Sequence, residues 1–371
     1  MPFDVRKFPA PADALRAARN RRLVALWLFT IAGMILVMVV LGGATRLTGS
    51  GLSIMEWAPI TGVLPPLNHA DWVKLFDLYK RIPQYSIVNH GFGLAGFQGI
   101  FWLEWVHRLW GRLIGVVFIV PLTWLWARGA IGRRLGLRLA LLFVLGGLQG
   151  AVGWFMVASG FRPDSVSVAP VRLVAHLVLA LALYAAILWT ALSVRRPMPR
   201  PIPGARPVRT LARLVAALVA LTVVAGGFTA GLHAGLEYNT FPLMDGRLVP
   251  ASYARLSPFL RNLTQNIAAV QFDHRVLATL TVLSVAALVA AGLSHALPRG
   301  ARAAVLAVGA AVVVQYALGI ATLLLVVPVP LGVAHQATAT LLLTAALVAW
   351  HSLRGAAVLP RAIEEKELEA T

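Results

Sequence analysis

The sequence predicts an all-α integral membrane protein whose eight transmembrane helices form two pseudo-symmetric four-helix bundles. Three observations lead to this fold class. Of the 371 residues, 59% are hydrophobic and only 13% are charged, whereas soluble domains are nearer to half apolar and a quarter charged. Eight apolar stretches have a length suited to a membrane-spanning helix. The order of polar residues in the first four stretches is repeated in the last four.

The eight stretches each approach or exceed the roughly 20 residues that cross a bilayer as a helix. They cover residues 23–43, 97–127, 139–158, 168–193, 211–232, 266–292, 303–327 and 330–352. The first stretch follows a basic N-terminus, and no small-residue cleavage site lies close behind it. We therefore interpret it as a retained span and not as a signal peptide.

Arginines between the apolar stretches predict the orientation of the chain. They gather in residues 1–22, after the second stretch, in residues 195–210 and after the sixth stretch. By the positive-inside rule we expect both termini in the cytoplasm and the long loops 44–96 and 233–265 on the periplasmic side of a bacterial inner membrane. Because the net charge of +19 comes from these separated groups and not from one continuous patch, it does not indicate nucleic-acid binding.

A segment rich in proline and arginine divides the chain into two halves. Proline is excluded from helix interiors, so this segment is expected to be a cytoplasmic linker. The expected halves, of four helices each, are residues 23–194 and 211–353, joined by the linker at residues 195–210. Cytoplasmic tails are expected at residues 1–22 and 354–371.

Both halves present the same polar residues in the same order. The first half contains, in sequence, Gly42-Gly43, His107-Arg108, Gln149 and His176. The second half contains Gly226-Gly227, His274-Arg275, Gln315 and His335. Such a repeat indicates duplication of a four-helix unit, and since both units run in the same direction, an axis along the membrane normal would relate them.

Four histidines lie early in spans that start at the periplasmic face: His107, His176, His274 and His335. Ionisable residues inside membrane spans are costly and usually functional, although packing histidines are an alternative. Two histidines on different helices of each half can ligate one haem iron from both sides. Zinc is a weaker explanation, because its sites usually cluster three or four protein ligands. The other histidines, without a repeat partner, are expected in loops or at interfaces: His69, His90, His233, His295 and His351.

Glu104 distinguishes the two halves. It lies three residues before His107, so the two side chains share one helix face, whereas the second half has Gln271 at the same offset before His274. This asymmetry suggests one catalytic site that contains Glu104 and one electron-carrying site. The alternative is a structural Glu104 that pairs with Arg108 or Arg112.

Five arginines near the outer ends of the spans are candidates for binding haem propionates, because a guanidinium group binds a carboxylate through two hydrogen bonds. They are Arg46, Arg108, Arg112, Arg172 and Arg275. Ordinary anchoring at the membrane interface explains them equally well. The chain has no cysteine, which excludes thiolate ligands, Fe–S clusters and covalent haem attachment through C-x-x-C-H.

Several long motifs resemble those of the haem A synthase family. Residues 42–53 (GGATRLTGSGLS) are similar to its first periplasmic signature, and E-W, P-I-T-G and L-P-P follow within residues 56–66. Residues 76–85 fit F-x-x-Y-K-x-x-P-x-Y, residues 104–108 fit E-x-x-H-R, and residues 238–244 read YNTFPLM. The resemblance extends over residues 22–355 and is to the cysteine-free branch shared by proteobacteria and mitochondria.

The resemblance implies an enzyme that oxidises a methyl substituent of haem O to a formyl group and so supplies haem A for cytochrome c oxidase. It implies that His107 and His176 hold the substrate haem, with Glu104 as the catalytic carboxylate beside it. It also implies that His274 and His335 ligate a haem b cofactor.

The expected partners are the lipid bilayer, haem O, haem O synthase, assembly factors of cytochrome c oxidase and an unidentified electron donor. Nucleic acid is not expected, and a homo-oligomer is possible. Two other functions remain open from the residues alone. A di-haem b electron carrier explains the four histidines without haem modification. A haem or small-solute transporter also has two related halves, but it predicts broken helices, and the apolar stretches contain few glycine or proline interruptions.

Overall fold

The computed structural model describes residues 11–59 and 61–357 of the chain. Within these residues, eight helices are long and apolar enough to cross a membrane, which confirms the prediction of an all-α membrane fold with eight spans. They are α1 (Pro11–Leu47), α3 (Leu94–Ala127), α4 (Arg133–Val157), α5 (Pro170–Arg195), α6 (Arg206–Gly231), α8 (Ile267–Ser294), α9 (Arg299–Leu324) and α10 (Val329–Ser352).

Shorter elements occupy the connections. The loop after α1 contains η2 (Thr61–Val63), α2 (His69–Tyr79) and η3 (Gln84–Val88), and η4 (Ala158–Phe161) follows α4. The loop after α6 contains η5 (Ala234–Leu236), η6 (Phe259–Arg261) and α7 (Asn262–Gln265). A two-residue strand in the linker, β1 (Ile202–Pro203), pairs in parallel with β2 (Ala356–Ala357) after α10. This pairing joins the linker to the end of the last span.

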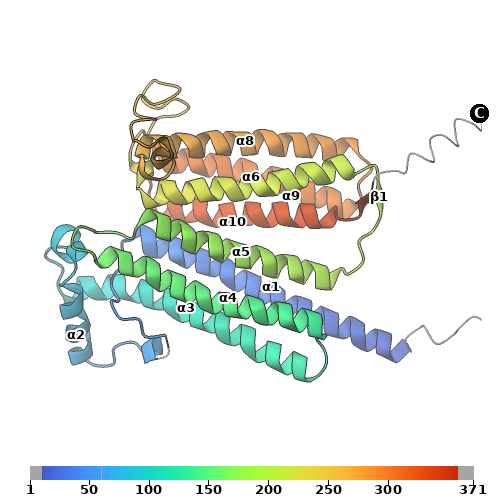
Figure 1. Cartoon of the computed structure of the whole chain (residues 1–371), viewed down its shortest axis with the longest axis horizontal. Helices are drawn as coiled ribbons and strands as arrows, with labels where there is room; N and C mark the ends of the chain where they lie inside the picture. Colours follow the sequence, from blue (N-terminus) through green and yellow to red (C-terminus); the bar gives the residue numbers. More distant parts are fainter. Residues whose placement is uncertain (1–10, 60, 358–371) are drawn as a thin grey trace, which may run out of the picture.

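The long helices pack in two groups of four. In the first group, α1, α3, α4 and α5 contact one another in that order, and α5 closes the ring on α1. In the second group, α6, α8, α9 and α10 contact one another in the same way, and α10 closes on α6. Helices α1 and α5 contact α10, and α5 also contacts α6, so these four form the seam between the groups (Figure 1). A pseudo-symmetric relation between the groups stays a prediction.

Several predicted helix starts were too late, among them that of α4, which begins at Arg133 and not at residue 139. Helix α1 begins at Pro11, not at residue 23, because residues 11–22 are rich in the strong helix formers alanine, leucine and arginine. Helix α6 begins at Arg206, not at residue 211, because Pro207 lies in its first turn, where a missing N–H costs no helix hydrogen bond. Of the two predicted tails, residues 1–10 and 358–371 lie outside the described residues.

One cluster of buried apolar side chains crosses the seam between the groups. It includes Leu28 on α1, Ile187 on α5, Val215 on α6 and Leu342 on α10. The two groups therefore share a core and do not meet only through surface contacts. Burying aliphatic side chains between helices lets them interdigitate, and such packing is the main attraction between helices in a bilayer.

The first long loop docks on the outer turns of α3 through aromatic side chains. Phe76 and Tyr79 from α2 pack against Phe97 and Phe101 of α3 in a second buried cluster. Tyr79 also donates a hydrogen bond to Gln84, whose side chain donates in turn to the carbonyl of Gly49. These contacts hold the loop over the part of α3 that carries Glu104 and His107.

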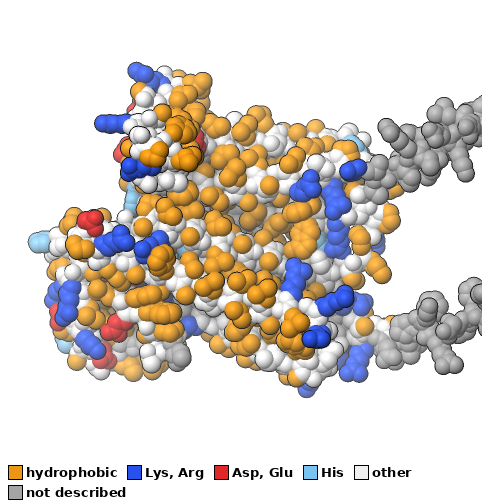
Figure 2. Space-filling view, viewed as in Figure 1, with side chains coloured by type: hydrophobic (Ala, Val, Ile, Leu, Met, Phe, Trp, Pro, Cys, Tyr) orange, Lys and Arg blue, Asp and Glu red, His pale blue; other side chains and the backbone are white. Residues whose placement is uncertain are grey.

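The two ends of the molecule differ in charge and in structure. Figure 1 shows the loops after α1 and after α6 at the same end of the helices. On the face seen in Figure 2, lysine and arginine side chains form a band at the opposite end. The expectation that both long loops lie on one side of the membrane is consistent with this arrangement.

Candidate functional site

The clearest histidine pair lies inside the second group of helices. His274 on α8 and His335 on α10 have ring centroids 6.5 Å apart, with ring planes 88° apart. Helices α8 and α10 are diagonal in their ring of four, so the two imidazoles meet across its centre. The separation leaves room for one metal atom with two bonds to nitrogen of about 2 Å each, the length of zinc–imidazole bonds.

The chemistry of the donors fits a haem iron better than zinc. Among the described residues, no group of three or more His, Cys, Asp or Glu side chains is placed to hold a metal ion. A structural zinc site needs about four such ligands and a catalytic site three. Two facing imidazoles would be enough for an iron that a porphyrin already holds, because haem iron takes only one or two ligands from the protein.

A glycine on the preceding helix faces each histidine of this pair. A Cβ atom on Gly226 of α6 would lie 2.9 Å from Cε1 of His274. A Cβ atom on Gly319 of α9 would lie 3.0 Å from Cε1 of His335. Side chains larger than hydrogen would push both rings away from their positions, since heavy atoms do not approach so closely without contact strain.

The first group of helices repeats this arrangement. His107 on α3 faces Gly42 on α1, where a Cβ atom would lie 3.2 Å from its Nε2 atom. His176 on α5 faces Gly153 on α4, where a Cβ atom would lie 2.9 Å from its Cε1 atom. All four glycines lie within the last turns of helices that end at the loop-bearing side. The four imidazoles are therefore held near that side, as the sequence predicts.

Two glutamines orient one histidine in each half. The Nε2 atom of Gln149 lies 3.0 Å from Nδ1 of His176 and donates to the carbonyl of His176 at 2.9 Å. The Nε2 atom of Gln315 lies 3.1 Å from Nδ1 of His335, and Thr338 donates to the other end of the Gln315 amide. Hydrogen bonds of this kind fix the ring orientation of a histidine that binds a metal.

Sequence reasoning identified the glutamines only as markers of the repeat and missed Gly153 and Gly319 altogether. Each of these glycines lies four residues after the glutamine, at Gln149 and Gln315, so Q-x-x-x-G occurs in both halves. Residues four apart share one helix face. That spacing could have shown that glutamine and glycine contact the same histidine.

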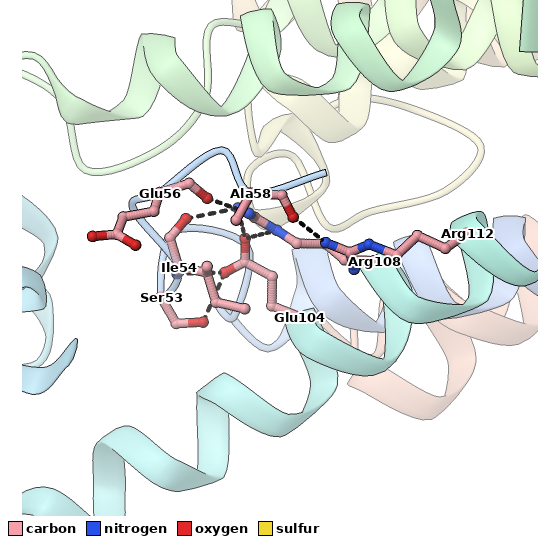
Figure 3. Close-up of polar contacts among 7 residues, drawn as sticks. All are labelled: Ser53, Ile54, Glu56, Ala58, Glu104, Arg108 and Arg112. Atoms are coloured by element: carbon pink, nitrogen blue, oxygen red, sulfur yellow. Dashed lines mark hydrogen bonds and ion pairs between the residues drawn. The ribbon is translucent and has the colours of Figure 1, made fainter. Parts of the chain in front are cut away.

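Glu104 is buried, with 2% of its surface exposed, and all of its hydrogen-bond partners are donors (Figure 3). Its Oε2 atom accepts from the Ser53 hydroxyl at 2.7 Å and from the Ile54 backbone N–H at 3.0 Å. Its Oε1 atom accepts from Nη2 of Arg108 at 2.6 Å and from Nε at 3.1 Å. Of the two arginines considered as structural partners, Arg108 forms the ion pair.

The same arginine and its neighbour hold the first loop by its backbone. Arg108 donates to the carbonyl oxygens of Ile54 at 2.6 Å and Glu56 at 2.9 Å. Arg112 donates to the carbonyls of Ala58 at 2.7 Å and Pro59 at 2.9 Å. Two arginines one helical turn apart therefore clamp residues 54–59 against α3.

The second half contains an equivalent clamp with an amide in place of the carboxylate. Gln271 accepts from Nη2 of Arg275 at 2.7 Å, and its own Nε2 donates to the carbonyls of Ala234 and Glu237, each at 2.6 Å. Arg275 also donates to the carbonyls of Tyr238 at 2.6 Å and Thr240 at 2.8 Å. Both halves thus have a buried polar side chain, an arginine four residues later and a loop that these two residues hold by its backbone.

All five arginines suggested as propionate partners donate to backbone carbonyls. Besides the three already described, Arg46 donates to Ala230 at 3.2 Å and so links α1 to α6. Arg172 donates to Phe155 at 2.8 Å, and its guanidinium carbon lies 3.7 Å from the centroid of that ring. Two buried donors, Nη1 of Arg112 and Nε of Arg275, have no partner among the described residues. Binding of propionates stays a prediction.

Most of the other histidines lie away from these pairs. His69, His90 and His233 are exposed in or beside the long loops, as expected. His351 is buried in the last turn of α10, next to Ser193 and Arg354. It lies at the opposite end of the helices from the four paired histidines, which supports its separation from them.

Eight membrane-spanning helices with histidines paired across diagonal helices define a multi-pass membrane protein with a repeated intramembrane site. Residues 25–347 match the model of the COX15-CtaA family, described as cytochrome oxidase assembly protein. The chain belongs to this family, which confirms the family predicted from the motifs.

Curated bacterial relatives are similar to the chain over nearly its whole length. The heme A synthase of Granulibacter bethesdensis is 62% identical over 338 residues, which are 91% of this chain and 89% of that protein. The heme A synthase 2 of Acidiphilium cryptum is 48% identical over 93% of this chain and 95% of that protein. The heme A synthase of Methylobacterium sp. (strain 4-46) is 48% identical over 90% and 93%.

Proposed function

We propose that this protein is a haem A synthase, an oxidoreductase that converts the methyl group of haem O to the formyl group of haem A for cytochrome c oxidase. The observation that carries the proposal is its 62% identity, over 91% of the chain, to a protein named heme A synthase. The paired histidines support it, because histidine is a common protein ligand of haem iron.

The two halves take different haems in this proposal. His274 and His335, whose rings face each other, would hold a haem b cofactor in the C-terminal half. His107 and His176 hold the substrate haem in the N-terminal half, which is the half with a buried carboxylate next to its site. The five arginines near the loop-bearing side are candidates for the propionates, with Arg112 and Arg275 retaining free donors.

The reaction requires two oxidations at one carbon. Hydroxylation of the methyl group, repeated once, gives a gem-diol that loses water to form the aldehyde. Each hydroxylation needs an oxygen atom and electrons from outside the chain. The haem b of the C-terminal half would supply a route for these electrons.

Glu104 acts on the substrate haem as a fixed negative charge. It accepts four hydrogen bonds, from Ser53, Ile54 and Arg108, and these hold the carboxylate in one position. A preorganised charge stabilises a positive charge that develops at the reacting carbon without reorganising during the step. We therefore favour electrostatic stabilisation over proton transfer for this residue.

The protein is a multi-pass bacterial membrane protein by its eight spans and its relatives. In the proposed orientation both termini are cytoplasmic in the inner membrane, and the two long loops are periplasmic. The band of basic side chains at the end opposite the loops supports this orientation (Figure 2). Haem O synthase, oxidase assembly factors and a separate electron donor are the proposed partners.

The test is to express the full chain with and without a supply of haem O, purify it in detergent and identify the extracted haems by chromatography. We expect a haem b signal in both preparations and haem A only where haem O is supplied. Haem O left unchanged under aerobic, reducing conditions would assign the chain to the electron carriers. A folded protein without any haem would contradict both functions.

A further inference from the structure

A basic cavity lies at the end of the helices opposite the long loops, away from the four paired histidines. Its volume is about 290 Å³, and it is lined by Arg206, Arg209, Thr210 and Arg213 of α6 and by Trp350 of α10. The three arginines are spaced so that they share one face of α6. Among the described residues, none of the three forms an ion pair. The cavity therefore presents several cationic groups without an anionic partner in that part of the chain.

An apolar groove continues from this cavity along the seam between the two helix groups. It has a volume of about 340 Å³, and its walls come from α5, α6 and α10. Small side chains such as Ala182, Ala217 and Ala220 open it, and Arg213 and Trp350 line both the groove and the cavity. The two spaces thus adjoin each other and together present a charged end and an apolar body.

The length of the groove matches one leaflet of a bilayer. From Arg213 to Val224 it follows α6 for about 16 Å at a rise of 1.5 Å per residue. One leaflet of the hydrocarbon core is about 15 Å thick, half of the full core of about 30 Å. Trp350 at the junction is half-buried, as is usual for tryptophan at the level of lipid headgroups.

We propose that this site binds one anionic phospholipid, with its phosphate among Arg206, Arg209 and Arg213 and an acyl chain in the groove. Basic pockets between transmembrane helices recognise anionic headgroups by their charge, and guanidinium groups bind phosphate oxygens through two hydrogen bonds. A free phosphate would use the cavity but not the groove. The glutamates of residues 361–371 are a rival source of negative charge, but the polar sequence RAIEEKELEAT does not suit an apolar groove.

The position of the site gives the lipid a structural effect. Its groove is walled by helices from both groups, and it reaches Leu177 on α5, the residue after His176. An acyl chain there would fill the seam between the half that carries His176 and the half that carries His335. We therefore expect the bound lipid to raise the thermal stability of the whole chain.

The test measures lipid binding to the purified full chain in a neutral detergent by native mass spectrometry. The probes are dioleoylphosphatidylglycerol, dioleoylphosphatidylcholine and inorganic phosphate. We expect one phosphatidylglycerol per chain, bound at least about tenfold more tightly than phosphatidylcholine, with phosphate unable to displace it. Equal binding of the two lipids, or complete displacement by phosphate, would overturn the proposal.

Two variants locate the binding, each with a matched control. R206Q/R209Q/R213Q should abolish the preference for phosphatidylglycerol, whereas R133Q/R134Q/R138Q, which removes three arginines at the start of α4, should keep it. A217F should reduce binding of phosphatidylglycerol by filling the groove, whereas A303F, at an exposed position of α9, should not. A control that loses binding as strongly as its partner would show diffuse attraction and contradict the site.

Thermal unfolding of the wild type and of A217F gives an independent readout if the arginine variant folds poorly. Phosphatidylglycerol should raise the unfolding temperature of the wild type more than that of A217F. The same increase in both proteins would show that the groove does not hold the lipid. Because these measurements need neither haem nor turnover, their outcome is separate from that of the proposed enzymatic function.

Discussion

The two loop clamps of this protein have the same frame and opposite hydrogen-bonding chemistry. In the N-terminal half a carboxylate, Glu104, accepts from Ser53, Ile54 and Arg108. In the C-terminal half an amide, Gln271, accepts from Arg275 but donates to two backbone carbonyls. The loop on each side is complementary to the residue that it meets. A buried polar group is stable only when its partners satisfy it, so each loop has to match its residue.

The clamp alone does not explain why one half carries a buried carboxylate and the other an amide. A neutral glutamine contacts the second loop through two hydrogen bonds, as many as the glutamate makes with the first loop. The carboxylate is therefore more than a tether, and a role for its charge at the neighbouring haem site is the economical explanation.

Loss of a histidine ligand should have the largest effect. His335→Ala and His274→Ala should each remove the low-spin haem b signal of the C-terminal half, because one axial ligand cannot replace two. His176→Ala should leave that signal in place and affect only the substrate site. Reduced-minus-oxidised spectra and haem-to-protein ratios of the purified variants measure this, with His69→Ala in the exposed loop helix as control. Loss of the signal in His176→Ala but not in His335→Ala would reverse the assignment of the halves.

Exchanging the two clamp residues should have the next largest effect. Glu104→Gln should lower haem A formation by about 10²-fold, as expected when one preorganised electrostatic contact is lost, with haem b binding retained. Gln271→Glu should instead destabilise the second loop by about 1–3 kcal/mol, because a carboxylate cannot donate to Ala234 and Glu237. Haem A yield and thermal unfolding separate the two outcomes. Normal haem A formation by Glu104→Gln would show that the negative charge of Glu104 is not needed for the reaction.

The eight spans and the approach of His274 to His335 could be predicted from sequence, because hydropathy sets span length and an internal repeat marks equivalent residues. The difference between Glu104 in the first half and Gln271 in the second could also be predicted from the sequence. The partners of Arg108, Arg112 and Arg275 could not, because they are mostly backbone carbonyls, which every residue has. The pairing of Ile202 with Ala356 was missed for a different reason, because a two-residue strand leaves no periodicity in the sequence.

A methyl group beside a histidine should have a smaller effect, confined to one half. Gly319→Ala would place its Cβ 3.0 Å from His335, and Gly153→Ala would place one 2.9 Å from His176. Overpacking of this kind costs about 1–3 kcal/mol, which corresponds to roughly a five- to hundred-fold loss of haem affinity. Gly319→Ala should weaken haem b, and Gly153→Ala the binding of haem O.

The control for these glycines is Gly150→Ala, on the same helix as Gly153, where an added Cβ has no atom outside its own helix backbone within 4 Å. Haem titration of the apo-proteins gives the affinities, and the ultraviolet circular dichroism of each variant reports helix content. Equal losses in Gly150→Ala and Gly153→Ala would show a general effect of helix substitution and not a contact with the ring.

Removal of a glutamine that orients a histidine should have the smallest effect, and it compares the halves most directly. Gln315→Leu and Gln149→Leu each keep the volume but lose the amide that contacts His335 or His176. Loss of such a partner lowers the affinity of a metal site by about 10- to 100-fold, and we expect the lower value because the glycine still fixes the ring position. Only Gln315→Leu should shift the midpoint potential of haem b, since the imidazole it orients is the ligand in that half. A shift of equal size in Gln149→Leu would mean that both histidine pairs bind the redox haem, and the division of labour inferred from Glu104 would then be wrong.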